Sequence, residues 1–347
     1  MGVVVSLLAP GVATLEGLDP AVWAGADRIE LRLDRFESED LPHWAAWIQA
    51  CPLPVVASLH GAGGLGSPLE SPDAHLARLQ DAVRAGASHV DVDWKWALDP
   101  RARFEKAARI VSRHVLDPHA DWRAAYQELC SHAEPTDRIK FVVAVEYAEQ
   151  GLEIMDWVHR QAVWPGGRSA FCMGERGAFT RLLALAQADA WVYCAPRTDP
   201  SAIELEPAAP GQWTLADWQA MAPPSPGAVQ AWEGIIGTPV RHSLSPMLHG
   251  QALRKAQEPV GYLPLDPRDL AGLLEALRPY RCRGFAVTAP YKREALALAT
   301  DASPAARALG AANTLRWTPQ GWFADNTDWI GVRDVLVAAW GAHAQRW

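Results

Sequence analysis

Eight short apolar or β-branched runs recur between the N-terminus and residue 194, and most are separated by longer stretches with helical spacing. Stretches such as 71–84 and 148–161 are long enough to cross back over a sheet, which parallel strands require. We therefore predict an α/β fold built from strand–helix repeats. The predicted strands are residues 3–8, 28–33, 54–59, 89–93, 108–112, 139–145, 170–173 and 191–194.

Eight such repeats favour a (β/α)₈ TIM barrel, although an open doubly wound sheet would show the same alternation of strands and helices. The proline-rich segment 222–227 interrupts the pattern and predicts a boundary between domains. We predict a barrel over 1–222, a linker over 223–232 and a smaller α/β domain over 233–347. In that domain the predicted strands are 234–237, 261–265 and 284–288, and the predicted helices are 245–257, 266–277 and 329–340.

Composition narrows the class of protein. A chain of 347 residues with 49% hydrophobic and 21% charged residues can fill two cores. Its net charge of -8 argues against nucleic acid or an anionic membrane as a partner. The five cysteines lack the spacing of a disulfide framework or a metal site, so we predict neither. The short apolar start has no basic leader and no run approaches the roughly 20 residues of a membrane span, which indicates a cytoplasmic protein.

A lysine lies inside a predicted strand. Lys140 has apolar neighbours on both sides in the run 139–145. Burial lowers the pKa of an amine, and a neutral amine is what condensation with a ketone requires. We interpret Lys140 as a candidate imine-forming lysine, while an edge lysine whose amine reaches solvent fits the same pattern.

Other charged groups lie near the predicted strand ends, where barrels place their chemistry. His114 follows the run 108–112 and would bring an imidazole beside the lysine, or it is a structural histidine. Glu30, Arg32 and Asp34 alternate along one strand and therefore share a face. They indicate either a polar pocket or a structural layer of ion pairs.

Taken in order, five motifs between Ser6 and Gln212 resemble type I 3-dehydroquinate dehydratase. The resemblance implies a lyase in which Lys140 forms a Schiff base with the 3-keto group, and His114 removes the C2 proton and helps the 1-hydroxyl leave. It also implies that Arg181 binds the substrate carboxylate. Contacts to hydroxyls are implied for Ser6, Glu30, Arg32 and Gln212. The motifs are Glu30-Leu31-Arg32-Leu33-Asp34, Ser112-Arg113-His114, Lys140, Thr180-Arg181 and Ala209-Pro210-Gly211-Gln212.

Three positions depart from that family's pattern. His60 stands where the family has an arginine, and Ala208 stands where it has a serine. The segment Gly61-Ala62-Gly63-Gly64 lacks the family's glutamate. Because a lost polar contact in a buried site typically costs about 1–3 kcal/mol, we expect weakened or altered activity rather than none.

The second half carries small polar residues at strand-to-helix junctions. Ser243 and Ser245 precede a predicted helix, where Ser245 with Pro246 is typical of a cap and first helical position. Thr288 and Lys292 follow the predicted strand 284–288. Asn313 and Asp328 lie in predicted turns, where such residues are ordinary.

Together these motifs resemble the substrate-binding domain of shikimate dehydrogenase from Glu233 to about Gly331, with Ala286 in place of the family's asparagine. The resemblance implies that Lys292 and Asp328 form the catalytic pair at the C3 oxygen. It implies that Ser243 and Ser245 bind the carboxylate and that Thr288, Asn313 and Asp328 contact ring hydroxyls. The motifs are Ser243-Leu244-Ser245-Pro246, Val287-Thr288-Ala289-Pro290-Tyr291-Lys292, Ala311-Ala312-Asn313-Thr314 and Asn326-Thr327-Asp328.

The resemblance implies NADP for the dehydrogenase half and no cofactor or metal for the dehydratase half. A dinucleotide site needs a glycine-rich turn between a strand and a helix. The glycines of 61–66 lie in the predicted barrel and do not fit this role, and the chain ends at Trp347, about where the family's cofactor domain begins. We therefore expect no reduction by this chain alone. Beyond its small-molecule substrates, we consider a homodimer or a separate NADP-binding chain as partners.

A hypothesis from another class is a non-catalytic binding or regulatory protein that senses shikimate-pathway acids. The departures at His60 and in the segment 61–64 favour it, as does the missing cofactor domain. The retained Lys140, His114, Lys292 and Asp328 favour a multifunctional enzyme of aromatic amino acid biosynthesis, because a pure sensor needs no proton-transferring pairs.

Overall fold

The computed structural model describes residues 2–60, 71–187, 189–198, 205–222 and 229–341. By its internal contacts the chain divides into two compact units, Met1–Glu146 with Glu153–Ala222, and Tyr147–Leu152 with Pro223–Trp347. Most of the predicted linker, residues 223–228, lies outside the described part of the chain. Each unit is therefore considered by itself.

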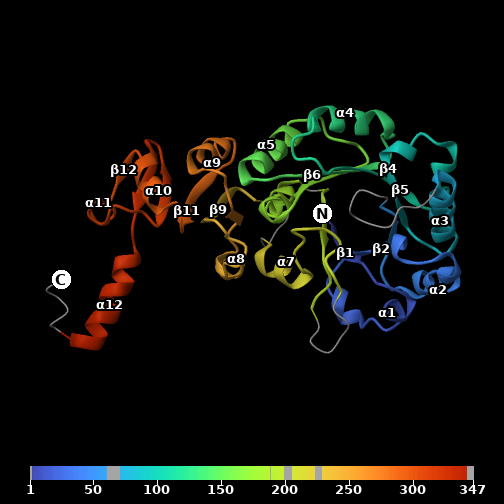
Figure 1. Ribbon diagram of the computed structural model, residues 1–347, viewed down its shortest axis with the longest axis horizontal. Helices are drawn as coiled ribbons and strands as arrows, with labels where there is room; N and C mark the ends of the chain where they lie inside the picture. The colour runs from blue at the N-terminus through green and yellow to red at the C-terminus, as the bar shows by residue number, and fades with distance from the viewer. Residues whose placement is uncertain (1, 61–70, 188, 199–204, 223–228, 342–347) are drawn as a thin grey trace. The chain divides into compact units, whose positions relative to one another are not determined.

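Eight parallel strands of the first unit wrap into a barrel, as Figure 1 shows. Their hydrogen-bonded order is β7-β6-β5-β4-β3-β2-β1-β8. The two ends of this order meet where the backbone N–H of Trp191 donates to Ser169 Oγ at 3.1 Å. The TIM-barrel prediction is confirmed, and the doubly wound alternative is wrong. The strands are β1 (Gly2–Leu7), β2 (Arg28–Arg32), β3 (Val55–Ser58), β4 (His89–Asp93), β5 (Ala108–Val115), β6 (Arg138–Ala144), β7 (Arg168–Met173) and β8 (Trp191–Cys194).

Helices cross between the barrel strands. Ser71 shows why one of them begins where it does, because its Oγ accepts the backbone N–H of Ala74 and Pro72 occupies the first turn. The α-helices are α1 (Val12–Glu16), α2 (Leu41–Ala50), α3 (Pro72–Arg84), α4 (Trp122–His132), α5 (Ala148–His159), α6 (Thr180–Leu183) and α7 (Leu215–Met221). Short 3-10 turns are η1 (Pro20–Trp23), η2 (Leu33–Arg35), η3 (Ser38–Asp40), η4 (Trp94–Trp96), η5 (Pro100–Ala102), η6 (Glu175–Gly177) and η7 (Ala184–Ala186).

The interior of the barrel changes from apolar to polar along the strands. Side chains at every second position of a strand point to the same face. Ser6 therefore lies on the inner face together with Val4, and His114 lies on the same face as Ile110, four residues before it. Strand β5 continues past the predicted end at residue 112 to Val115, so His114 is part of the barrel wall. Polar groups therefore collect toward the carboxyl ends of the strands. The apolar floor consists of Val4, Val56, Ile110, Val142, Phe171, Met173, Trp191 and Tyr193.

The second unit is a mixed six-stranded sheet in the order β10-β9-β11-β13-β14-β12, which confirms the predicted smaller α/β unit. The hairpin β13–β14 was not predicted. The predicted helix 266–277 begins only at Leu270, because the carboxylate of Asp269 caps it by accepting the N–H of Gly272. The elements are β9 (Ala231–Ile236), β10 (Val260–Leu265), β11 (Cys282–Val287), β12 (Asp301–Ala302), β13 (Thr314–Thr318), β14 (Gly321–Asp325), α8 (Ser245–Lys255), α9 (Leu270–Ala276), α10 (Lys292–Leu298), α11 (Pro304–Leu309) and α12 (Asp328–Trp340).

Two further features concern membrane-spanning helices and disulfide bonds. Among the described residues, every helix is too short or too polar to cross a lipid bilayer. All five cysteines are free thiols, so side-chain packing and polar contacts hold the fold without cross-links.

Candidate active site

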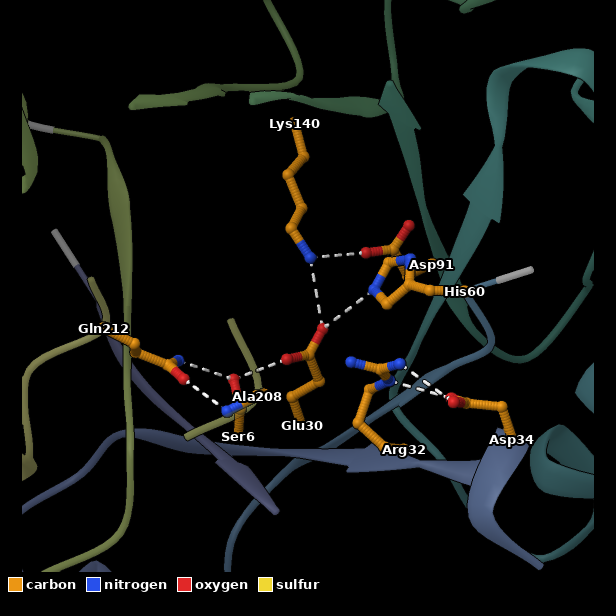
Figure 2. A network of polar contacts seen from close by, with 9 residues as sticks. All are labelled: Ser6, Glu30, Arg32, Asp34, His60, Asp91, Lys140, Ala208 and Gln212. Carbon is orange, nitrogen blue, oxygen red and sulfur yellow. Dashed lines mark hydrogen bonds and ion pairs between the residues drawn. The ribbon is translucent and has the colours of Figure 1, made fainter. Parts of the chain in front are cut away.

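Lys140 lies on β6 inside the barrel, and only 4% of its surface is exposed. Its Nζ is 2.9 Å from Asp91 Oδ2 on β4 and 3.1 Å from Glu30 Oε1 on β2, as Figure 2 shows. The same nitrogen lies 4.2 Å from the centre of the Tyr193 ring. The lysine is therefore buried among polar partners, and the alternative of an edge lysine reaching solvent is wrong.

The two carboxylates decide the charge of this lysine. Burial by itself disfavours the ammonium, but Asp91 and Glu30 outweigh burial and raise the pKa of Lys140 above that of a free lysine. Burial also raises the pKa of Glu30, yet Lys140 and His60 bring it well below its usual range. The expectation of an uncharged amine is thus wrong for the protein without substrate, because the sequence does not show the two partners.

Two imidazoles face this cluster. The rings of His114 on β5 and His60 after β3 lie edge to face, with centroids 4.7 Å apart. His60 Nε2 is 3.7 Å from Glu30 Oε1, which Figure 2 also shows. Burial, reinforced by the charges of His60 and Lys140, lowers the pKa of His114 well below its ordinary value. At neutral pH His114 is therefore neutral and able to accept a proton.

A chain of hydrogen bonds orients Glu30 from the other side (Figure 2). Ser6 Oγ donates to Glu30 Oε2 at 2.5 Å, and Gln212 Nε2 donates to Ser6 Oγ at 3.3 Å. The backbone N–H of Ala208 donates to Gln212 Oε1 at 2.8 Å. Gly211, which precedes Gln212 in this turn, has a φ of +75°, and a Cβ on it would come within 2.2 Å of a backbone oxygen. The turn therefore requires glycine at this position.

Two buried arginines differ in their partners. Arg32 forms a bidentate pair with Asp34, with both contacts at 2.8 Å, so the ion-pair interpretation holds for these two. Arg181 on α6 donates to the carbonyl oxygens of Cys172 and Gly211 at 3.1 and 3.3 Å. No carboxylate pairs with Arg181 in the described part of the chain, and burial lowers its pKa to about 10. A bound anion would neutralise this charge.

The structure brings all seven residues predicted for the barrel site into one pocket of about 370 Å³, measured with its mouth. Sequence reasoning missed Asp91, although the alternation His89-Val90-Asp91-Val92-Asp93 repeats the pattern that singled out Glu30. It also missed Tyr193. The predicted departure in the segment 61–64 lies outside the described residues. The seven residues are Ser6, Glu30, Arg32, His114, Lys140, Arg181 and Gln212.

The same cluster has the spacing of a metal site. One donor atom each of Glu30, His60 and Asp91 lie within 4.8 Å of one another. However, Lys140 Nζ already contacts both carboxylates. The lysine supplies the positive charge there, and we assign no metal to these groups.

In the second unit, Lys292 at the start of α10 and Asp328 at the start of α12 form an ion pair of 2.6 Å. Asn313 Nδ2 donates to Asp328 Oδ1 at 2.8 Å and to Thr327 Oγ1 at 2.9 Å. The hydrogen bond from Lys292 lowers the pKa of Asp328, so the carboxylate is ionised at neutral pH. The structure thus brings three of the predicted residues together at a surface open to solvent.

The three hydroxyl residues predicted for this unit lie on two other segments. The N–H of Ser245 donates to Ser243 Oγ at 3.2 Å in the loop that enters α8. Leu244 occupies the cap position of α8, and Ser245 is its first residue, so the prediction that Ser245 caps the helix is wrong. Thr288 directly follows β11, where its N–H donates to the carbonyl of Ile236 at 2.9 Å. Among the described contacts, none joins these hydroxyls to the lysine–aspartate pair.

Comparisons with known proteins divide the chain in the same way. The family model of type I 3-dehydroquinase matches residues 3–222, and that of the shikimate dehydrogenase substrate binding domain matches residues 235–315. The shikimate dehydrogenase (NADP(+)) of Syntrophobacter fumaroxidans is 41% identical over 102 residues, which are 29% of this chain and 36% of that protein. The pentafunctional AROM polypeptide of Zygosaccharomyces rouxii is 26% identical over 343 residues, covering 92% of this chain and 20% of that protein.

Solved structures support the fold. The dehydroquinate dehydratase and shikimate dehydrogenase from S. pombe AroM superposes with a TM-score of 0.53 at 22% identity, covering 97% of this chain and 67% of that chain. At this identity the likeness concerns the fold alone. The chain spans 20% to 42% of the length of the first curated relatives that it matches.

Proposed function

Because the chain belongs to the type I 3-dehydroquinase family, we propose that its barrel dehydrates 3-dehydroquinate to 3-dehydroshikimate through an imine on Lys140. One observation carries the proposal: a buried lysine shares its pocket with a neutral imidazole and with an arginine that pairs with none of the described carboxylates. These groups can condense with a ketone, accept a proton and hold a carboxylate.

The proposed reaction balances as follows. Lys140 loses one proton, and the resulting amine attacks the C3 carbonyl carbon. That proton and a second one from the attacking nitrogen pass to the carbonyl oxygen, which leaves as water and gives an iminium. The iminium makes the C2 proton acidic, and His114 removes it. The resulting enamine expels the C1 hydroxyl, which leaves as water with the proton from His114. Hydrolysis then restores the lysine, while the carboxylates of Glu30 and Asp91 stabilise the cationic intermediates.

The remaining polar groups would hold the substrate. We assign the carboxylate to Arg181, because a bidentate ion pair would neutralise its buried charge. Ser6, Arg32 and Gln212 line the same pocket and would contact the ring hydroxyls together with Glu30.

Borohydride reduction tests the imine directly. When the protein is incubated with 3-dehydroquinate and borohydride, its mass is expected to increase by one reduced adduct, located on Lys140 by peptide mapping. Lys140→Ala is expected to give no adduct, whereas the exposed control Lys95→Ala should react like the wild type. Tight binding without any adduct would instead support the alternative, a non-catalytic sensor of shikimate-pathway acids.

For the second unit we propose binding of 3-dehydroshikimate and shikimate. Lys292 and Asp328 would contact the C3 oxygen, Ser243 and Ser245 the carboxylate, and Thr288 and Asn313 the ring hydroxyls. NADP would supply the hydride for a reduction at C3. Among the described residues of this unit, no glycine-rich turn joins a strand to a helix as a dinucleotide site requires. We therefore assign no residue to NADP and derive no reduction step.

Shikimate binding tests this assignment by calorimetry, since shikimate lacks the ketone that the barrel needs. Asp328→Asn should weaken binding by roughly tenfold, because the variant loses a charged hydrogen-bond acceptor. The matched control Asp301→Asn removes an exposed ion pair to Arg307 in the same unit and should leave the affinity unchanged. Equal affinities of Asp328→Asn and the wild type would contradict the assignment.

The two proposed functions would reside in residues 1–222 and 233–347, joined by 223–232. The product of the barrel would then be the ligand of the second unit, so the chain would join consecutive steps of aromatic amino acid biosynthesis. Five free thiols suit a reducing compartment, and we place this activity in the cytoplasm.

A further inference from the structure

The barrel layer below the lysine is cationic rather than apolar. It consists of the first residues of the four even-numbered strands, and barrels usually fill such a layer with branched apolar side chains. Here the four residues are Arg28 on β2, His89 on β4, Arg138 on β6 and Trp191 on β8. Their side chains point inward, because each lies two positions before a residue that faces the barrel interior. Those residues are Glu30, Asp91, Lys140 and Tyr193.

Two guanidinium groups of this layer share one indole. The guanidinium carbons of Arg28 and Arg138 lie 4.1 and 4.3 Å from the centre of the Trp191 ring. The ring of His89 meets the same indole edge to face, with centroids 4.9 Å apart. Burial and the two guanidinium charges lower the pKa of His89 to about 4, so this imidazole is neutral at pH 7. The layer therefore carries the positive charges of both arginines.

The carboxylates next to these arginines are engaged by other groups. Asp27 and Asp189 each accept a backbone N–H, at 2.7 and 3.2 Å. Both oxygens of Asp137 accept hydrogen bonds from Arg109. Asp189 raises the pKa of Arg138 as a more distant charge, against the larger effect of burial. Among the described residues, no carboxylate forms an ion pair with either guanidinium of the layer.

Both arginines keep hydrogen-bond donors for a ligand. Each guanidinium has five N–H donors. Arg138 Nη1 donates to the backbone oxygen of Asp189 at 2.9 Å, and the Nε of Arg28 is buried without a partner in the described part of the chain. A Cβ on Gly2 would come within 2.8 Å of Arg28 Nη1, and a Cβ on Gly167 would overlap the other guanidinium. Glycines thus leave room for both groups, which are half-buried and within reach of solvent.

We propose that Arg28 and Arg138 bind a dianionic oxyanion, either phosphate or a phosphate monoester, at the amino-terminal end of the barrel. Two guanidiniums beside a neutral imidazole carry a charge of about +2, which a phosphate group of about −1.5 to −2 balances. A planar guanidinium pairs with two phosphate oxygens at once. The site lies at the end of the strands opposite to the pocket mouth, and it is independent of the dehydratase proposal.

Calorimetric titration with inorganic phosphate in Tris buffer tests the proposal. Each full-length protein carries Arg181→Met, so that the barrel pocket does not add an anion site of its own. This parent should bind one phosphate at the site. Arg28→Met and Arg138→Met should each weaken the binding by roughly 10-fold or more, because each removes a charged hydrogen-bond donor. The matched control Arg84→Met removes an exposed arginine, paired with Asp81 at the end of α3, and should bind phosphate like the parent.

Thermal unfolding gives a second measurement that does not depend on how a substitution changes basal stability. A ligand that binds only the folded state raises Tm. Phosphate should raise the Tm of the parent, and this rise should be absent in Arg28→Met. Sodium chloride at the same ionic strength should give a smaller rise in the parent, because screening alone does not supply a paired ligand.

Three results would overturn the proposal: a parent that binds no phosphate, equal binding by the parent and both arginine variants, or a rise in Tm that sodium chloride reproduces. Glycerol phosphate separates the two sources of the ligand. Tighter binding than that of inorganic phosphate would identify a phosphorylated metabolite, and weaker binding would identify free phosphate. The borohydride test of the dehydratase can fail while this site stands, and the reverse also holds.

Discussion

Lys140→Met is expected to abolish dehydration and, at neutral pH, to lower the free energy of unfolding by about 3–5 kcal/mol. Activity is lost because, among the described residues that line the pocket, Lys140 is the one lysine that could form the imine. Stability is lost because Lys140 lies within 3.1 Å of two buried carboxylates, Glu30 and Asp91, which the variant leaves without their shared partner. The size of the effect follows from removing one member of a buried ion pair.

The loss of stability in Lys140→Met depends on pH in a definite direction. In the wild type the pKa of Glu30 is lowered by folding, so its stabilising contribution is present above about pH 4.3 and is lost only as the pH falls through the lower folded pKa. The pKa of Lys140 is raised, so its contribution is fully present below about pH 10.4. Without the lysine, burial should raise the pKa of Glu30. The folded variant then binds extra protons and gains stability as the pH falls from 8 to 5.

Urea unfolding at pH 8 and pH 5 measures both effects. The deficit of Lys140→Met relative to the wild type should be largest at pH 8 and shrink at pH 5. A deficit of the same size at both pH values would show that Glu30 does not depend on the lysine for its charge.

The main elements of the barrel could be predicted from the sequence, because parallel strands buried on both faces leave apolar runs at regular spacing. Lys140 could be singled out for the same reason, since a charge inside such a run stands out. The hairpin β13–β14 (Thr314–Thr318 and Gly321–Asp325) was not predicted, because the polar motifs at its two ends, around Asn313 and Asp328, are typical of turns.

The charge state of Lys140 could not be predicted, because it depends on contacts between strands that are distant in the sequence. Glu30 and Asp91 are 110 and 49 residues away from the lysine along the chain. The burial of Lys140 could be inferred from its apolar neighbours in the sequence. The two carboxylates that reverse the effect of burial on its pKa come close only when the barrel is formed. His60 illustrates the same limit, since the sequence shows a missing arginine and only the structure shows the shared carboxylate oxygen.

Arg181→Met is expected to reduce kcat/KM for 3-dehydroquinate by about 100-fold or more while changing the free energy of unfolding by only about 1 kcal/mol. Arg181 is 1% exposed, and its Nε has no hydrogen-bond partner in the described part of the chain. Removing it deprives two carbonyl oxygens of a donor, but it also removes a buried charge that none of the described carboxylates neutralises. These two effects on stability offset each other, whereas the substrate carboxylate loses its partner entirely.

Arg109→Met is the matched control, because Arg109 is also buried but has a carboxylate partner. Its Nε and Nη2 donate to the two carboxylate oxygens of Asp137 at 2.9 and 2.6 Å, near the amino-terminal ends of β5 and β6 and away from the site. Arg109→Met should therefore lower the free energy of unfolding by about 3–5 kcal/mol and leave kcat/KM of the folded protein unchanged.

The methyl ester of the substrate separates a role of Arg181 in binding the carboxylate from a general disturbance of the pocket. Because the ester carries no negative charge, the wild type and Arg181→Met should process it at similar, low rates. A loss in Arg181→Met that is equally large for acid and ester would mean that Arg181 shapes the pocket rather than pairing with the carboxylate. Among the described residues, Arg181 donates to carbonyl oxygens and pairs with no carboxylate, which is the arrangement expected of a site that acquires its counter-ion from the ligand. The acid and the ester together test that expectation.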